Sequence, residues 1–389
     1  MKEDSKRAMR SKSIWISRDS GSLDGLKRLC ETETVASDWP FAQEVRDNVP
    51  IYDASVAEAQ GSERTDLMAE WCDAFRTGPG VVVLRQAIAD TAALDRATEM
   101  FSDMIEQERI RGAVGDYFAK KGANDRVWNS LEKQCVADPE NFSAYFSGAA
   151  IDLVSRAWLG DGYQMTAQVN RVNPGGTAQF AHRDYHLGFM TGERMESFPA
   201  HVHQLSPMLT LQGAVAHVDM PLETGPTTYL PYSQLYFEGY LAFSRPEFQS
   251  YFDQTRVQLP LKKGDAVFFN PAVMHAAGTN ATEDRYRMGN LLQVSSAMGR
   301  AMETVNRLRM VKALYPTLLA SDMSSAARAR VIAASAEGYS FPTNLDRDPP
   351  IGGRAPKTQA TIMSESLEAG LPPDAFNVLV DDLQMRQLS

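Results

Sequence analysis

The strongest constraint on the fold is a change of pattern after Gly160. From there, short apolar runs alternate with polar residues and are separated by turn signals rich in Gly, Pro, Asn and Asp. Four of these signals are Asn173-Pro174-Gly175-Gly176, Thr224-Gly225-Pro226, Lys262-Lys263-Gly264-Asp265 and Asn270-Pro271. Several short strands at this spacing are typical of an antiparallel sandwich or barrel. We therefore predict a β core over residues 160–297.

Helical periodicity brackets this core on both sides. Apolar residues recur at three- and four-residue spacing in five segments, which predict helices over 62–77, 91–109, 140–158, 301–318 and 324–337. The β-branched run from Val81 to Leu84 predicts a buried strand. The predicted fold class is α+β, with a mainly β core flanked by N- and C-terminal helices.

A chain of 389 residues is long enough for two or three domains, although a decorated β-barrel of this length can be one domain. We expect a single domain over 61–338, made of helices over 61–158, the core over 160–297 and helices over 301–337. Residues 1–60 are polar and weakly periodic, which favours an arm. Residues 339–389 are interrupted by Pro and Gly pairs, which favours an extended tail that wraps the domain.

Charge and cysteine usage exclude several classes. Lys and Arg total 39 against 49 Asp and Glu, a formal net charge of −10, so neither nucleic acid nor an anionic membrane is an expected partner. The three cysteines are widely spaced, without a CxxC pair, which argues against a disulfide framework or a structural zinc site. No stretch approaches the ~18 apolar residues of a membrane span, and the N-terminus lacks a secretory signal. A cytoplasmic location is expected.

All six histidines lie between residues 182 and 275, within the predicted core. His182 and Asp184 form an H-x-D motif, and alternate residues of a strand share one face. His275 follows a turn and a strand further along the chain and offers a third ligand. Two His and one carboxylate that leave three positions open form the facial triad of non-haem Fe(II) oxygenases. The open positions are what a bidentate co-substrate and O₂ require.

Such an iron centre needs electrons from a co-substrate, commonly 2-oxoglutarate, whose distal carboxylate is best held by an arginine. Arg285 and Arg287 lie ten and twelve residues after His275, at the start of the next predicted strand. The two side chains share a strand face. We favour Arg287 because it lies deeper in the strand, and Arg285 stays open as the alternative.

The other histidines have simpler interpretations. His217 and Asp219 form a second H-x-D, but this motif runs directly into a turn, where Asp219 is expected to accept hydrogen bonds from turn amides. His201 and His203 follow Pro199 in a predicted loop and favour structural roles. His186 shares the strand face of the ligands and is a candidate pocket residue.

The chain resembles the phytanoyl-CoA dioxygenase family of Fe(II)/2-oxoglutarate oxygenases over about residues 160–297. The landmarks are Asn173-Pro174-Gly175, His182-Arg183-Asp184, Glu223-Thr224-Gly225-Pro226-Thr227, Leu230-Pro231-Tyr232-Ser233, Gly264-Asp265, Phe268-Phe269, His275-Ala276-Ala277-Gly278-Thr279-Asn280 and Arg287. The resemblance implies a double-stranded β-helix (jelly-roll) with iron held by His182, Asp184 and His275. It also implies an arginine for 2-oxoglutarate after the distal His, and Gln168 as a co-substrate hydrogen-bond donor.

The chain departs from the family pattern at three places. The family usually has its arginine eleven residues after the distal His, where this chain has Tyr286. The usual P-G-S-H is replaced by Pro231-Tyr232-Ser233-Gln234, and Arg171 is the nearest substitute for a basic residue common before the first metal motif. Asp184 is retained, whereas halogenating relatives replace this carboxylate. We therefore favour hydroxylation or a related oxidation over halogenation.

The predicted function is an Fe(II)- and 2-oxoglutarate-dependent dioxygenase that uses O₂ to oxidise a small organic metabolite. From strand direction, the candidate substrate contacts are Asn170, Arg171, Tyr185, His186 and Gln293. The alternatives are a cupin-like divalent-metal hydrolase or isomerase, and a non-catalytic ligand-binding barrel. The amphipathic segment 301–318 is a candidate homodimer face, although packing on the outside of the barrel is favoured.

Overall fold

The computed structural model of the chain describes residues 14–111, 122–350 and 352–388. Its strands are β1 (Glu44–Arg46), β2 (Val49–Asp53), β3 (Val81–Arg85), β4 (Asn124–Val127), β5 (Gln164–Val172), β6 (Thr210–Ala216), β7 (Thr228–Leu230), β8 (Val257–Gln258), β9 (Ala266–Phe269), β10 (Met274–Ala276) and β11 (Arg287–Ser295). Its α-helices are α2 (Leu23–Cys30), α3 (Gly61–Arg76), α4 (Thr91–Ile110), α5 (Ser130–Ala137), α6 (Pro139–Phe146), α7 (Ala149–Leu159), α8 (Gly192–Glu196), α9 (Ala200–Leu205), α10 (Pro246–Thr255), α11 (Arg307–Ala320), α12 (Ser325–Ser335), α13 (Gln359–Glu368) and α14 (Pro373–Gln387).

The strands form a large sheet in the order β1-β2-β3-β9-β6-β11-β5-β4 and a small sheet in the order β10-β7-β8. His182 adds an isolated bridge to His275 at the edge of the small sheet. From β5 onward the chain therefore passes repeatedly between the two sheets, with antiparallel pairing throughout. This is the topology of a double-stranded β-helix, and it confirms the predicted fold class.

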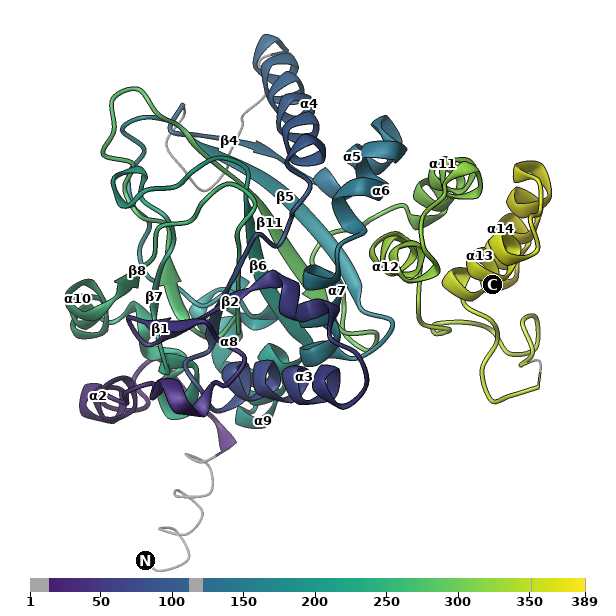
Figure 1. Ribbon diagram of the computed structural model, residues 1–389. Helices are drawn as coiled ribbons and strands as arrows, with labels where there is room; N and C mark the ends of the chain where they lie inside the picture. Colours follow the sequence, from purple (N-terminus) through teal and green to yellow (C-terminus); the bar gives the residue numbers. More distant parts are fainter. Residues whose placement is uncertain (1–13, 112–121, 351, 389) are drawn as a thin grey trace, which may run out of the picture.

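Strand alternation gives the large sheet two different faces. Along β11, Met288, Leu292 and Val294 are fully buried in a core shared with α3 to α7. The intervening residues of β11, including Arg287, point to the opposite side, toward the small sheet. Figure 1 shows α5, α6 and α11 to α14 on one side of the strands, and α2 and α10 on the opposite side. The face of the large sheet that does not pack on the helical core lines the barrel interior.

The predicted elements are largely confirmed, with differences over 140–158 and at the two ends of the chain. The strand over 81–84 is β3, and the helix over 91–109 is α4. The helix expected over 140–158 is two helices, α6 and α7, separated at Ser147 and Gly148. The segment expected to be an arm contributes β1 and β2, and β2 pairs in parallel with β3. Residues before Gly61 thus extend the large sheet.

Residues 339–389, which we expected to form an extended tail, instead contain α13 and α14. Both helices begin with clear N-terminal signals, because Thr358 caps α13 with its side chain and Pro373 is the first residue of α14. Phe376, Val380 and Leu383 recur at helical spacing and are buried against the preceding helices. Figure 1 shows α13 and α14 beyond α11 and α12, away from the barrel.

The structure supports the favoured expectation that segment 301–318 packs within the chain. The apolar residues of α11, such as Met310, Leu314 and Leu318, are fully buried in the core of the chain. Tyr315 stacks on Phe376 of α14 with ring centroids 3.9 Å apart. Among the described helices, none is long and apolar enough to span a lipid bilayer.

Candidate metal centre

His182, Asp184 and His275 converge at the mouth of the barrel. His182 and His275 face each other across an antiparallel bridge, and their backbones exchange hydrogen bonds of 3.0 and 3.1 Å. The Asp184 amide donates to the carbonyl of Pro271 at 2.9 Å, which ties the first ligand segment to the loop before β10. One potential ligand atom from each of the three side chains lies within 4.8 Å of the others. In the described ranges, they are the sole group of three such residues.

Both imidazoles are oriented by backbone carbonyls. The Nδ1 atom of His182 lies 2.8 Å from the carbonyl of Phe180, and that of His275 lies 3.0 Å from the carbonyl of Val273. A proton on Nδ1 satisfies each carbonyl and leaves Nε2 with a free lone pair. Both Nε2 atoms lie 3.4 Å from the Asp184 carboxylate. Two neutral imidazole nitrogens and one carboxylate on a single side fit a divalent iron with open positions.

The electrostatics of the group favour a charged carboxylate. Burial alone would raise the pKa of Asp184, but the adjacent His182 and His275 imidazoles outweigh it and hold that pKa well below its usual range. Burial alone would lower the pKa of His182, but the Asp184 carboxylate outweighs it and raises that pKa. Asp184 therefore presents the anionic form that a metal ion requires.

Two further side chains fix the ligands in place. Gln212 of β6 donates from Nε2 to the Asp184 carboxylate at 3.1 Å, and Gln212 is itself buried. Phe269 of β9 packs against the His275 ring, with centroids 4.7 Å apart. Such outer contacts hold metal ligands in productive orientations.

Arg183 supports the ligand segment from the side opposite to the ligands. Between residues 181 and 188 burial alternates strictly, so His182, Asp184 and His186 lie on one side and Arg183 and Tyr185 on the other. The Arg183 side chain is 1% exposed, and its Nη1 donates to the carbonyls of Ser233 and Ala272. The guanidinium therefore connects the first ligand segment to the loop that carries the distal His.

The structure separates the two candidate arginines. Arg287 is 7% exposed, faces the barrel interior, and donates weakly to the carbonyl of Thr224 at 3.4 Å. Within the described residues, its guanidinium has no carboxylate partner. Burial lowers the pKa of Arg287 to about 10, so it stays protonated at neutral pH. Arg285 is solvent-exposed and lies 3.5 Å from Glu223. Arg287 is thus the buried cation that a distal carboxylate of 2-oxoglutarate fits.

Gln168 faces the interior on β5, but its side chain already has partners. Its amide oxygen accepts a 2.7 Å hydrogen bond from Arg126 of β4, and Glu303 lies close to both residues. Arg126 is the interior basic residue that sequence reasoning missed. Arg171, the expected substitute, instead makes an ion pair with Asp125 at 3.1 Å. No local pattern predicts that Arg126 faces the interior, because its orientation depends on the pairing of β4 with β5, which are separated by more than 35 residues of chain.

The remaining substrate candidates divide according to their strand face. In the antiparallel register, Gly289 of β11 is opposite Asn170, and Gln293 is opposite Thr166, so Asn170 and Gln293 share the interior face. His186 is held at both nitrogens, by Thr210 at 3.0 Å and by the carbonyl of Arg300 at 2.7 Å.

Tyr185 does not line this interior. It is fully buried on the opposite side of its segment, where its hydroxyl lies 3.0 Å from His203 Nδ1. The prediction that Tyr185 contacts substrate is therefore wrong, because it is one residue out of phase with the ligands.

The second H-x-D lies elsewhere. His217 is fully buried on the helix side of the large sheet, between Thr98 at 2.9 Å and Tyr145 at 3.1 Å. Asp219 accepts a 2.9 Å hydrogen bond from the Lys263 amide, as expected for a turn. His201 and His203, which were expected in a loop, lie on helix α9; His203 is buried and bonded to Tyr185, whereas His201 is exposed.

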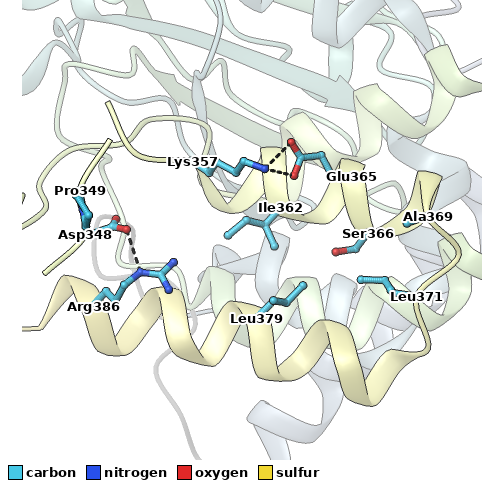
Figure 2. Close-up of a pocket in the computed structure, with 10 residues that line it drawn as sticks. All are labelled: Asp348, Pro349, Lys357, Ile362, Glu365, Ser366, Ala369, Leu371, Leu379 and Arg386. Carbon is cyan, nitrogen blue, oxygen red and sulfur yellow. Dashed lines mark hydrogen bonds and ion pairs between the residues drawn. The ribbon is translucent and has the colours of Figure 1, made fainter. Parts of the chain in front are cut away.

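A pocket of about 410 Å³ lies between α13, α14 and the loop before α13. Figure 2 shows an apolar centre at Ile362 and Leu379, between the Lys357–Glu365 and Asp348–Arg386 ion pairs. None of the three ligand residues lines this pocket. We therefore place the chemistry at the barrel mouth and not in this cavity.

One family model matches more than half of the chain. The model of the family "Phytanoyl-CoA dioxygenase (PhyH)" matches residues 67–289. Dioxygenase FrzG of Cladobotryum sp. is 29% identical over 134 residues, which are 33% of this chain and 40% of FrzG, so the match spans less than half of that relative.

Two solved structures are similar at 19% and 18% identity. The non-heme alpha ketoglutarate dependent carbocyclase SnoK from nogalamycin biosynthesis has a TM-score of 0.43 and is covered over 86% of its chain and 62% of this one. For the epimerase SnoN from the same biosynthesis, the TM-score is 0.38, with coverage of 84% and 60%.

Proposed function

The chain belongs to the phytanoyl-CoA dioxygenase family, a family of Fe(II)- and 2-oxoglutarate-dependent oxygenases, and we propose that it is a dioxygenase of this type. In this proposal it hydroxylates, or otherwise oxidises, a small organic metabolite and releases succinate and CO₂. The observation that carries the proposal is the convergence of His182, Asp184 and His275, with both Nε2 atoms directed at the carboxylate. The buried Arg287 on the same interior supports it.

Each side chain has a role in this proposal. His182, Asp184 and His275 would hold the iron, and Gln212 would keep the Asp184 carboxylate in orientation. Arg287 would pair with the distal carboxylate of 2-oxoglutarate. When bound, iron and 2-oxoglutarate supply the activation of O₂, with decarboxylation of the 2-oxo acid to succinate.

The interior around Arg287 is largely apolar. Tyr229, Phe269, Val267 and Met220 are among its buried residues. A lining of this kind excludes water, which strengthens the charge pairing between Arg287 and a bound carboxylate. Asn170 and Gln293 lie further along the same face, and we propose that they contact the substrate.

Arg287 is also what distinguishes this function from the alternatives. A divalent-metal hydrolase or isomerase in the same barrel needs no buried cation for a second carboxylate. Arg287 makes one long hydrogen bond, of 3.4 Å, to a carbonyl, so an anionic ligand would offset the unfavourable burial of its charge. A non-catalytic barrel would tolerate the loss of a ligand, yet all three ligands are present and oriented.

The test is anaerobic addition of Fe(II), followed by 2-oxoglutarate and then O₂. We expect a visible charge-transfer band when 2-oxoglutarate is added and succinate after O₂ is admitted. A folded, metal-loaded protein that gives neither band nor succinate would contradict the proposal. As a control, His275→Ala should give no band. If this variant produced succinate at the parent rate, the ligand assignment would be wrong.

A further inference from the structure

Glu303 has a buried carboxylate oxygen that no described group uses. The residue lies in the loop between β11 and α11, where its Oε1 atom accepts a 3.0 Å hydrogen bond from the Asn129 amide. Its Oε2 atom is buried and makes no hydrogen bond within normal geometry. Within the described residues, the carboxylate also has no cation at ion-pair distance. Burying an unpaired carboxylate is unfavourable, so this one requires an explanation.

The two cations that act on Glu303 have other partners. Arg126 donates to the Gln168 amide oxygen at 2.7 Å, and Lys133 lies 3.2 Å from Glu108. Both charges favour the ionised form of Glu303, but burial outweighs them and raises its pKa. A further cation at Oε2 would therefore stabilise this carboxylate more than the protein itself does.

The loop that carries Glu303 borders the same interior as the metal centre. Three residues earlier, the carbonyl of Arg300 lies 2.7 Å from Nε2 of His186. His186 is on the same side of its segment as the metal ligands. At the other end of the loop, Glu303 lies beside Gln168, which faces the interior on β5. The loop thus reaches from the ligand segment to the interior face of β5.

Strand register gives the distance between the two ends of this space. Gln212 of β6, Gln293 of β11 and Thr166 of β5 are successive partners across the large sheet. Neighbouring strands lie ~4.8 Å apart, so Thr166 is about 10 Å from Gln212, which donates to a metal ligand. Gln168 is the next residue on that face of β5. A molecule that extends from the metal centre to Glu303 is therefore about 10 Å long.

We propose that Glu303 binds a cationic nitrogen of the substrate, an ammonium or a guanidinium, and thereby selects a substrate that carries this group about 10 Å from the carbon oxidised at the metal. The proposal rests on the proposed function, since it names the class of substrate for the same site. A cationic N–H group would donate to Oε2 and neutralise the carboxylate, and such charge-assisted hydrogen bonds are the strong ones.

A purely structural role explains Glu303 less well. The Asn129 amide needs only an acceptor, and the side-chain oxygen of a glutamine would serve it equally. Glutamine would also avoid the cost of burying a charge. The charge of Glu303 is therefore the feature that a ligand would use.

The experiment compares two probes, N-hexylguanidinium and N-hexylurea, which have the same shape and length but differ in charge. A guanidinium stays protonated, so it is a poor metal ligand. Each probe is titrated by anaerobic calorimetry into protein loaded with Fe(II) and 2-oxoglutarate. We expect the parent to bind the guanidinium at least about tenfold more tightly than the urea. Glu303→Gln should raise the Kd of the guanidinium about tenfold or more and leave that of the urea within about twofold.

Glu132→Gln provides a matched control. Glu132 accepts from the Asn129 side chain and from the Asn306 amide, both at 2.9 Å, and lies 3.4 Å from Arg309, so it already has partners. This variant should leave both Kd values unchanged. Glu303→Gln without probe should unfold at the parent's temperature or above it, because glutamine still accepts from Asn129. A clear loss of stability in Glu303→Gln would assign the carboxylate a structural role and overturn the proposal.

The outcomes separate this inference from the proposed function. If the parent forms no complex with 2-oxoglutarate, the proposed function fails and the inference fails with it. If the parent binds 2-oxoglutarate but binds the guanidinium no more tightly than the urea, only the inference is overturned. The same holds if Glu303→Gln binds the guanidinium as tightly as the parent does. If Glu303→Gln weakens both probes alike, the carboxylate does not act through charge, and selection of a cation is also overturned.

Discussion

The chain contains the same short motif twice, and only one copy belongs to a metal centre. His182 and Asp184 lie at the barrel mouth, where His275 from another strand completes a set of three. His217 and Asp219 lie at the end of β6, where the histidine turns into the helix-side core and the aspartate accepts a turn amide. The motif itself is thus uninformative. Its meaning depends on the face of the sheet and on what the opposite strand supplies.

The largest expected effect comes from removing the carboxylate in each motif. Asp184→Ala should weaken Fe(II) binding by more than ~100-fold, since even loss of an outer partner of a metal ligand costs 10–100-fold. Succinate formation should be lost. Asp219→Ala should leave both unchanged, because its partner is the Lys263 amide. Anaerobic metal titration of the two variants measures the difference, and equal loss in both would break the comparison.

The two arginines after His275 form a second pair in which similar residues have different environments. Arg287→Ala should raise the Kd for 2-oxoglutarate by about 30-fold or more, because it removes a buried charge from its ionic partner. Arg285→Ala should change it less than about twofold, since exposed ion pairs contribute little. The Kd comes from the anaerobic titration described above. If Arg285→Ala has the larger effect, the burial argument is wrong.

Gln212 provides a further difference between the two H-x-D motifs. The Asp184 carboxylate accepts from the side chain of Gln212, whereas Asp219 accepts from the backbone amide of Lys263. Gln212→Leu removes the 3.1 Å hydrogen bond to Asp184 and nearly preserves side-chain volume. We expect Fe(II) affinity to fall about tenfold, at the lower end of the usual effect of such partners. Gln293→Leu is a suitable control, because Gln293 lies opposite Gln212 on β11 and, within the described residues, its side chain makes no hydrogen bond to a metal ligand. Equal metal affinity in Gln212→Leu and the parent would contradict the assigned role.

Local patterns predicted the β core and most helices, and the family resemblance added the jelly-roll and the grouping of His182 and Asp184 with His275, which the structure brings together. Alternation places His182 and Asp184 on one face, and the turn after Asp219 marks the end of a strand. Sequence reasoning favoured Arg287 but kept Arg285 as an alternative, since a one-residue change in the preceding turn would alter which arginine faces the site. It also missed Arg126, whose place on the interior face depends on the pairing of β4 with β5, a strand far away in the chain. Strand pairing at long range is not encoded in any short window.

The smallest expected effect is on stability and concerns His217, the histidine of the second H-x-D motif. Burial lowers the pKa of His217 to about 3, and its charged neighbours Asp95 and Lys263 form an ion pair with each other. An unfolded histidine titrates near 6.5, so the unfolded chain takes up a proton at mildly acidic pH that the folded chain does not. Stability is therefore full above pH 6.5 and decreases as pH falls toward 3.

From pH 7 to pH 5.5 this one group should lower the free energy of unfolding by about 1 kcal/mol. His217→Gln should remove that part of the decrease, because an amide can bond to Thr98 and Tyr145 without titrating. Urea unfolding of parent and variant at the two pH values gives the difference, in which the contributions of all other groups cancel. An identical pH dependence in both proteins would mean that His217 has the same pKa in the folded and the unfolded chain. Its burial between Thr98 and Tyr145 would then not keep it neutral at acidic pH.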